Sequence, residues 1–207
     1  AAAVLALALD EGSAMVLGGV IAGLWTHPAV AWTALYAAPF RPLPAALLSP
    51  ATRIDTPDGP RPAEALRRGD TVLTLDGPAR VAAAVSRRLP LRGTLAPVRL
   101  RAGYCAIARD IVTGPRQPVL VDGFGVEDAT GRDDILMRAE GLARTRLAER
   151  IEGPGTLPML SLALDRPALI SAEGMAFAAA GPLPEPLATA AEAAAIVRHY
   201  RHRAVTR

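Results

Sequence analysis

The chain has 207 residues, a formal net charge of +3 and a basic isoelectric point near 9.7. This length suits one domain, or one domain with a short appendage, and it is enough to bury a core without disulfides. Every basic residue other than histidine is arginine, and the arginines form scattered pairs such as Arg67-Arg68 and Arg87-Arg88 rather than a stripe with interleaved aromatic residues. We therefore expect no nucleic-acid partner.

Cysteine and histidine usage limits the chemistry further. Cys105 is the only cysteine, which excludes an internal disulfide framework and a cysteine-rich zinc site. His27, His199 and His202 lie towards the two ends of the chain and have no recognisable ligand spacing. We therefore predict no metal site and no bound cofactor, and we expect Cys105 to be a small buried or partly buried side chain.

Residues 1–46 are predicted to form an apolar N-terminal segment and linker. Residues 12–40 carry no charge and are long enough to cross a bilayer, for which ~20 apolar residues suffice. However, Gly18-Gly19 and Thr26-His27-Pro28 interrupt a helix there, so we expect packing in water against the domain or another chain. The first residue is alanine, which indicates a fragment or a processed product and leaves the compartment open between cytoplasmic and secreted.

The most informative stretch is 52–76, which reads TRIDTPDGPRPAEALRRGDTVLTLD. Alternating side-chain character predicts a strand at 52–55 and a second strand at 71–75. Between them, Pro57-Asp58-Gly59-Pro60 is typical of a turn, because proline fixes φ and glycine accepts a positive φ. Good helix formers at 63–68, ended by a glycine, predict a short helical turn.

The rest of the chain is predicted to hold further short strands and one helix. The strands cover 79–88, 97–103, 119–121, 157–164 and 168–171, and the last two should form a closing hairpin around 165–167. Residues 134–147 favour helix formation. Three prolines make a stiff spacer before an alanine-rich helix at 187–200 with a basic end. The expected core comprises Ile54, Leu66, Val72, Leu73, Val98, Leu100, Val119, Val121, Leu162, Leu164 and Ile170.

Stretch 52–76 resembles the start of the Hint (hedgehog/intein) domain in its bacterial form. Thr52, Ile54, Thr56-Pro57 and Gly59 match the family pattern xTxIxTPxG. The following residues fit P-V-E-x-L-x-x-G-D-x-V-L-T at Pro62, Glu64, Leu66, Gly69-Asp70 and Val72-Leu73-Thr74. Residues 97–103 are similar to the family's P-V-R-I-R-A-G strand, and 172–174 match its final A-E-G turn. The alternative is that 52–76 is a β-turn-β element of a small β-sheet protein outside this family.

The resemblance implies a mostly β, Hint-type curved fold of short strands over residues 47–181. An apolar N-terminal segment would precede it at 1–46, and a proline-rich spacer with a C-terminal basic α-helix would follow at 182–207. In the family piece that corresponds to 134–147, a short helix is followed by a strand.

Hint domains cut or splice their own chain, and the resemblance implies where that chemistry would lie. A Cys, or sometimes Ser, at the first residue attacks the preceding carbonyl, and the His of a T-x-x-H or S-x-x-H motif protonates the leaving nitrogen. Leu47 stands at the nucleophile position, Gly114 at the hydroxyl position and Gln117 at the histidine position. Leucine cannot attack, and glutamine cannot titrate.

A shift of one residue does not restore the chemistry. It places Thr113 in the hydroxyl role and Arg116 in the histidine role, and arginine cannot transfer a proton near neutral pH. The family's late D-x-H motif falls on Asp165-Arg166-Pro167, again without a histidine.

We therefore predict a catalytically silent Hint-fold domain, a structural or protein-interaction module. Its partner would be its own flanking polypeptide or another protein, and its oligomeric state stays open. The alternative is a self-cleaving domain in which a displaced Ser49 is the nucleophile, with Asp55 and Asp70 as the nearest acids in sequence. A further alternative is a β protein outside this family.

Overall fold

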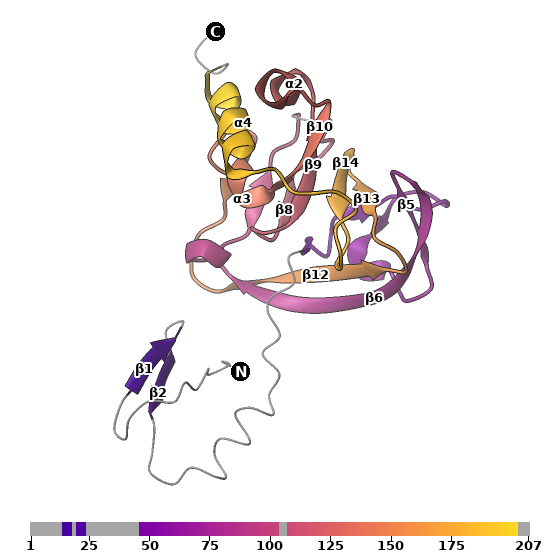
Figure 1. Cartoon of the computed structure of the whole chain (residues 1–207). Helices are drawn as coiled ribbons and strands as arrows, with labels where there is room; N and C mark the ends of the chain where they lie inside the picture. The colour runs from indigo at the N-terminus through magenta and orange to yellow at the C-terminus, as the bar shows by residue number, and fades with distance from the viewer. Residues whose placement is uncertain (1–13, 18–19, 24–45, 104–106, 203–207) are drawn as a thin grey trace. The chain divides into compact units, whose positions relative to one another are not determined.

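The computed structural model describes residues 14–17, 20–23, 46–103 and 107–202 (Figure 1). The chain divides into two units, residues 1–43 and 44–207. In the first unit, β1 (Ala14–Leu17) and β2 (Val20–Gly23) form an antiparallel hairpin. Most of the predicted N-terminal segment, and Cys105, lie outside the described residues, so the predicted packing of 1–46 stays a prediction. Among the helices described, none has the length and apolar character needed to cross a membrane.

The second unit is built mainly from antiparallel strands, which confirms the predicted mostly β fold class (Figure 1). Its larger sheet has the strand order β10-β9-β14-β13-β5-β6-β12, with β3 paired to β13 and β4. The strands of this sheet are β3 (Arg53–Ile54), β4 (Arg61–Pro62), β5 (Thr71–Thr74), β6 (Gly77–Pro90), β9 (Pro118–Asp122), β10 (Asp134–Arg138), β12 (Thr156–Leu164), β13 (Leu169–Ala172) and β14 (Met175–Ala178).

A smaller sheet and short helices complete the unit. The sheet has the order β11-β7-β8, formed by Ala148–Arg150, Val98–Leu100 and Ile111–Thr113. The α-helices are α2 (Phe124–Thr130), α3 (Ala139–Leu142) and α4 (Ala190–His202), and the 3-10 turns are η1 (Ala63–Ala65) and η2 (Gly93–Leu95). The helical turn predicted at 63–68 is therefore the shorter η1.

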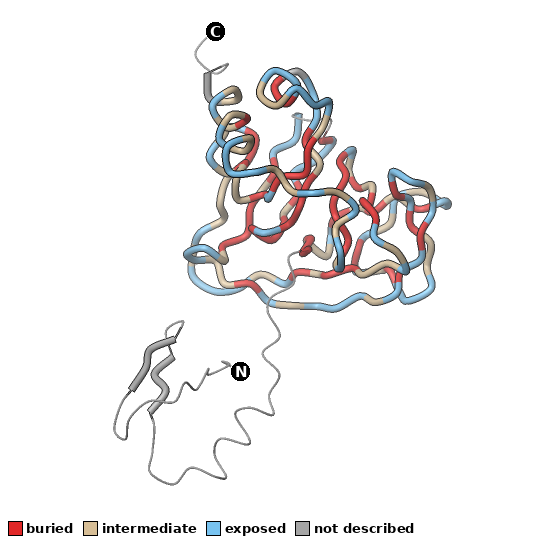
Figure 2. Tube along the Cα trace, in the orientation of Figure 1, coloured by how far each residue is buried: buried red, intermediate tan, exposed pale blue. Residues whose placement is uncertain are grey.

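The core follows the alternation of the strands (Figure 2). Of the predicted core residues, all but Leu73 and Leu164 are buried. Leu73 is 36% exposed and was wrongly placed in the core, because its neighbour Val72 is fully buried and successive side chains of a strand point to opposite faces. Leu164 is half-buried and packs against the core.

Two predicted supersecondary features are wrong. Strands 157–164 and 168–171 exist, but they do not form a hairpin, since β12 pairs with β6 while β13 pairs with β14, β5 and β3. The chain between them is diverted by Asp165, whose N–H donates to the Arg80 carbonyl at 2.9 Å. Residues 134–147 are helical only in α3, because 134–138 pair with β9 as β10.

The C-terminal helix begins three residues later than predicted. Thr189 forms a reciprocal cap with Glu192: the Thr189 N–H donates to the carboxylate at 2.7 Å, and the Glu192 N–H donates to the threonine hydroxyl at 3.3 Å. The Thr189 N–H is also the main cause that holds the pKa of Glu192 below its ordinary value. Leu187 instead pairs with Leu136 at the edge of β10, and Ile196 fixes the helix to the core.

The alternation in β5 gives a matched pair of substitutions. Val72→Ala should lower the free energy of unfolding by about 2 kcal/mol, because it removes two fully buried methyl groups. Leu73→Ala should change it by only about 0.5 kcal/mol, because Leu73 lies on the exposed side of the strand. Urea denaturation followed by circular dichroism measures both. Equal losses would show that the register of β5 is wrong.

Candidate functional site

The candidate site begins where residues 47–49 run between β8 and β12. The Gly114 N–H donates to the Leu47 carbonyl at 2.8 Å, and the Ser49 N–H donates to the Val112 carbonyl at 2.8 Å. On the other side, Leu48 exchanges two backbone hydrogen bonds with Leu160, at 2.8 and 2.7 Å. The segment therefore acts as a very short strand that joins the smaller sheet to the larger one.

Gln117 brings the first residue of the domain to the central loop. Its side chain is fully buried, and its Oε1 accepts a hydrogen bond from the Leu47 N–H at 2.6 Å. Its Nε2 donates to the carbonyls of Pro118 and Ala178, both at 3.0 Å. These partners fix the orientation of the amide, since the acceptor end must face the N–H and the donor end the carbonyls. The structure thus places Leu47 and Gln117 in direct contact.

Gly114 lies against the side chain of Leu47. A Cβ atom at position 114 would lie 2.9 Å from the Leu47 Cβ and 3.3 Å from its Cδ1. The Leu47 side chain is almost fully buried, at 2% exposure. Leu47 thus occupies the space beside the position where the resemblance expects a hydroxyl residue.

The shifted pair, Thr113 and Arg116, does not come together as a site. Thr113 is fully buried, while Arg116 is exposed. The Thr113 hydroxyl has no hydrogen-bond partner among the residues that the structure describes. A buried hydroxyl in this state costs free energy, because it has lost its bonds to water without replacement.

Ser49 is half-buried at the end of the same segment. Its hydroxyl accepts a hydrogen bond from the Ala51 N–H at 3.4 Å, and within the described part of the chain it has no hydrogen bond to a carboxylate or an imidazole. Asp55 accepts from the Ser171 hydroxyl. Asp70 accepts from the Arg67 N–H at 2.9 Å and pairs with Arg61 at 3.4 Å. Both acids are thus engaged elsewhere.

Two further contacts were not predicted from the sequence, and the first of them supports the site. The N-terminus of α3 holds the central loop, because the Ala139 N–H donates to the Gln117 carbonyl at 2.9 Å and the Glu140 N–H donates to the Pro115 carbonyl at 2.8 Å. Arg166, from the late D-x-H position, donates instead to the turn between β5 and β6, including the Asp76 carbonyl at 3.1 Å. No sequence signal marks either contact, because both join segments far apart in the chain.

The chemistry open to this arrangement is hydrogen bonding. Gln117 holds the backbone N–H of Leu47 without any titratable group, and an amide neither gives nor takes a proton near neutral pH. Within residues 46–103 and 107–202, no group of three or more histidine, cysteine, aspartate or glutamate side chains could hold a metal ion.

Comparison with known proteins gives one family and several similar structures. The family model for the Hint domain matches residues 47–181. No curated protein matches the chain. The crystal structure of the MchDnaB-1 intein is 18% identical with a TM-score of 0.42, covering 64% of this chain and 98% of the intein. The gp41-1 intein is 13% identical with a TM-score of 0.45, covering 64% of this chain and 97% of the intein.

The contacts of Gln117 predict a large loss of stability when its amide is removed. Gln117→Ala leaves the Leu47 N–H and two carbonyls without this partner, and each unpaired buried group costs about 1–3 kcal/mol. We expect the free energy of unfolding to fall by at least about 2 kcal/mol. Arg116→Ala, at the exposed neighbouring position, is the control and should change it little. A loss below that of the control would contradict the hydrogen-bond assignment.

The unpartnered hydroxyl of Thr113 predicts that its removal stabilises the protein, in contrast to the removal of the Gln117 amide. Thr113→Val should raise the free energy of unfolding by about 1 kcal/mol, because a methyl group replaces a buried hydroxyl that has no partner. Thr74→Val is the matched control, since the Thr74 hydroxyl donates to the Gly77 carbonyl, and this substitution should destabilise the protein. Thermal unfolding of both variants measures these changes. Destabilisation by Thr113→Val would mean that the Thr113 hydroxyl does form a hydrogen bond.

Proposed function

The chain belongs to the Hint domain family, and we propose that in this member the domain is catalytically silent and serves as a structural or protein-interaction module. The observation that carries the proposal is the 2.6 Å hydrogen bond from the Leu47 N–H to the Gln117 Oε1. Cleavage before Leu47 would make this nitrogen the leaving group, so it would need a proton from a nearby acid. Gln117 instead presents an acceptor oxygen to the nitrogen.

The nucleophile position supports the same proposal. The aliphatic side chain of Leu47 has no lone pair with which to attack the Ala46 carbonyl. Both steps of the family's reaction thus lack their group, and general acid–base help alone typically contributes ~10²–10⁴ in rate. The frame around the positions is nevertheless complete, because residues 47–49 are hydrogen-bonded on both sides. A frame that holds a polypeptide segment without cutting it suits a structural or binding role.

The alternative with Ser49 as nucleophile requires a base and access to the Ala46 carbonyl. The hydroxyl of Ser49 accepts a hydrogen bond from the Ala51 N–H, which lies further along the chain. Asp55 and Asp70 are bound to Ser171, Arg61 and Arg67. The contacts described for Ser49 therefore favour the silent module.

The proposal predicts that the wild-type protein stays intact. Mass spectrometry after prolonged incubation at neutral pH, with and without dithiothreitol, should find one mass and no fragment from cleavage at the Ala46–Leu47 bond. Ser49→Ala should behave in the same way. Wild-type cleavage that disappears in Ser49→Ala would overturn the proposal and make Ser49 the nucleophile.

The geometry also predicts how cleavage could be restored. Leu47→Cys with Gln117→His supplies a thiol and an acid at two positions that are already in contact. We expect thiol-dependent cleavage from this double variant, and less when Gly114→Ser is added, because a Cβ at 114 would lie 2.9 Å from the Cβ of residue 47. A misplacement of about 1 Å can cost a hundredfold in rate.

The control for this restoration is Gln117→His alone. It adds the acid but leaves Leu47 without a nucleophile, so the protein should remain intact. Cleavage by this single variant would contradict the role assigned to position 47, and faster cleavage by the triple variant would contradict the steric role of Gly114.

A further inference from the structure

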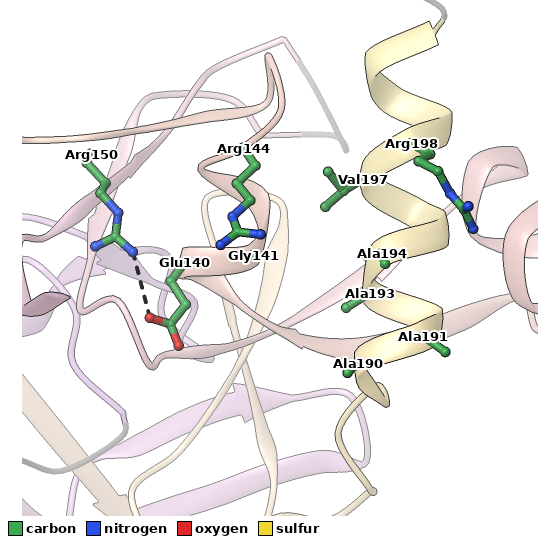
Figure 3. Close-up of a pocket in the computed structure, with 10 residues that line it drawn as sticks. All are labelled: Glu140, Gly141, Arg144, Arg150, Ala190, Ala191, Ala193, Ala194, Val197 and Arg198. Carbon is green, nitrogen blue, oxygen red and sulfur yellow. Dashed lines mark ion pairs between the residues drawn. The ribbon is translucent and has the colours of Figure 1, made fainter.

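A groove of about 600 Å³ lies between α3 and α4 (Figure 3), and Leu47 is not among the residues that line it. Glu140 and Gly141 of α3, Arg144 just beyond it and Arg150 of β11 form one wall. The other wall is α4, which contributes Ala190, Ala191, Ala193, Ala194, Val197 and Arg198. In Figure 3, Ala193 and Val197 point towards α3, while Arg198 points to the other side of its helix and lies at the rim.

The charged side chains of the groove are mostly cationic. It is lined by three arginines and one carboxylate, that of Glu140. The Glu140 carboxylate lies 3.8 Å from the Arg150 guanidinium, and both side chains are about one third exposed, at 31% and 32%. This is a long, partly solvated ion pair, and such pairs are weak. A carboxylate of a bound molecule can therefore compete with Glu140 for Arg150.

The opposite wall is apolar and has little side-chain bulk. Ala190, Ala194 and Val197 follow the i, i+4, i+7 spacing of one helix face. Alanine side chains allow a second helix to approach at the short end of the usual interaxial range, about 8 Å. The wall is firmly held, because Ile196 is buried on the inner side of α4 and Thr189 and Glu192 cap its first turn.

We propose that this groove binds an acidic helical segment of another protein. One face of the segment, with small and aliphatic side chains, would pack on Ala190, Ala194 and Val197, and its carboxylates would meet Arg144 and Arg150. The inference deepens the proposed role as a protein-interaction module and rests on it. The small alanine side chains allow a helix to pack closely on α4. The arginines favour an acidic helix, because a basic helix would bring like charges together.

The binding test uses the full chain and a fluorescein-labelled amphipathic peptide of alanine, leucine and glutamate, about 15 residues long so that it can form a helix. Fluorescence anisotropy should show that this peptide binds the wild type saturably. A control peptide with lysine in place of glutamate should not bind. Glu140→Gln should tighten binding, because Arg150 loses its competing carboxylate. Weaker binding by Glu140→Gln would contradict the proposal.

Two kinds of variant separate the contribution of charge to peptide binding from that of the shape of the groove. Arg144→Glu with Arg150→Glu should weaken binding by about tenfold, since the two cations proposed to meet the carboxylates of the peptide become anions. Arg68→Glu with Arg109→Glu, at exposed positions outside the groove lining, is the charge-matched control and should weaken it much less. Ala194→Leu should also weaken binding, because it fills the groove without changing charge, and leucine is a good helix former.

Other results would also overturn the inference. Equal weakening by both charge-reversed pairs would mean nonspecific attraction. Unchanged binding by Ala194→Leu would place the peptide elsewhere. Sedimentation that finds a wild-type dimer abolished by Ala194→Leu would assign the groove to a second copy of the chain. Intact mass, measured on the same samples, keeps the two proposals apart: a protein that cleaves itself but binds the peptide refutes only the silent module, and an intact protein that binds none refutes only the groove.

Discussion

The buried side-chain amide of Gln117 holds together the segments that form the candidate site. It joins the first residue of the domain, the central loop and β14 through hydrogen bonds to Leu47, Pro118 and Ala178. Inside a protein, such bonds act at low dielectric, where leaving any of the groups unpaired is costly. The amide supplies one acceptor and two donors, which matches the groups around it. The position of Leu47 between β8 and β12 depends on this match.

The site separates the requirements of the fold from those of the chemistry. The residues that shape the frame, such as the turn at Gly59 and the buried Ile54, act through backbone conformation and packing. Leu47 and Gln117 sit where the family's chemistry would act, and each satisfies a structural need there. Burying a leucine side chain contributes about 1.5–3 kcal/mol, and a hydrogen-bonded glutamine keeps polar groups paired without a titratable proton. The same two side chains thus meet structural needs of the site, and in the proposed silent module they would also be the reason that no cleavage occurs.

Local pattern in the sequence was enough to predict several of the strands, most of the core and the C-terminal helix, but not β8, β10, β11 or β14. Ile54, Val98 and Val121 follow the period of two that one buried face requires. Val72 and Leu73 could not be distinguished in this way, because both neighbours are apolar. The false hairpin at 157–171 has another cause. Two adjacent strands favour a hairpin by proximity, yet β12 pairs with β6, and β13 pairs with β14, β5 and β3. The connecting residues Asp165 and Arg166 contact Arg80 and Asp76, about 90 residues away.

The resemblance names Leu47, Gly114 and Gln117 as positions of a candidate site, and whether they form a functional site stays a prediction. Their contacts could not be predicted from the sequence, because they depend on the final packing, and the hydrogen bond from Leu47 to Gln117 crosses 70 residues of chain. The unpartnered hydroxyl of Thr113 could not be inferred, since a threonine in a strand gives no sign of which groups surround it. The groove beside α4 had no signal either, because alanines in a helix read only as good helix formers.

The close approach of Gly114 to Leu47 has a consequence for evolutionary history. Trimming Leu47 would remove the contacts of its Cγ and Cδ1 with a new side chain at 114, but its Cβ would still lie 2.9 Å from a Cβ there. A hydroxyl residue at 114 therefore cannot arise first without strain, and the backbone segments must move apart before it is tolerated. The strain at 114 thus does not depend on which side chain position 47 carries beyond its Cβ. A lineage that acquired a hydroxyl residue at 114 would need a backbone shift as well, whatever residue stood at 47.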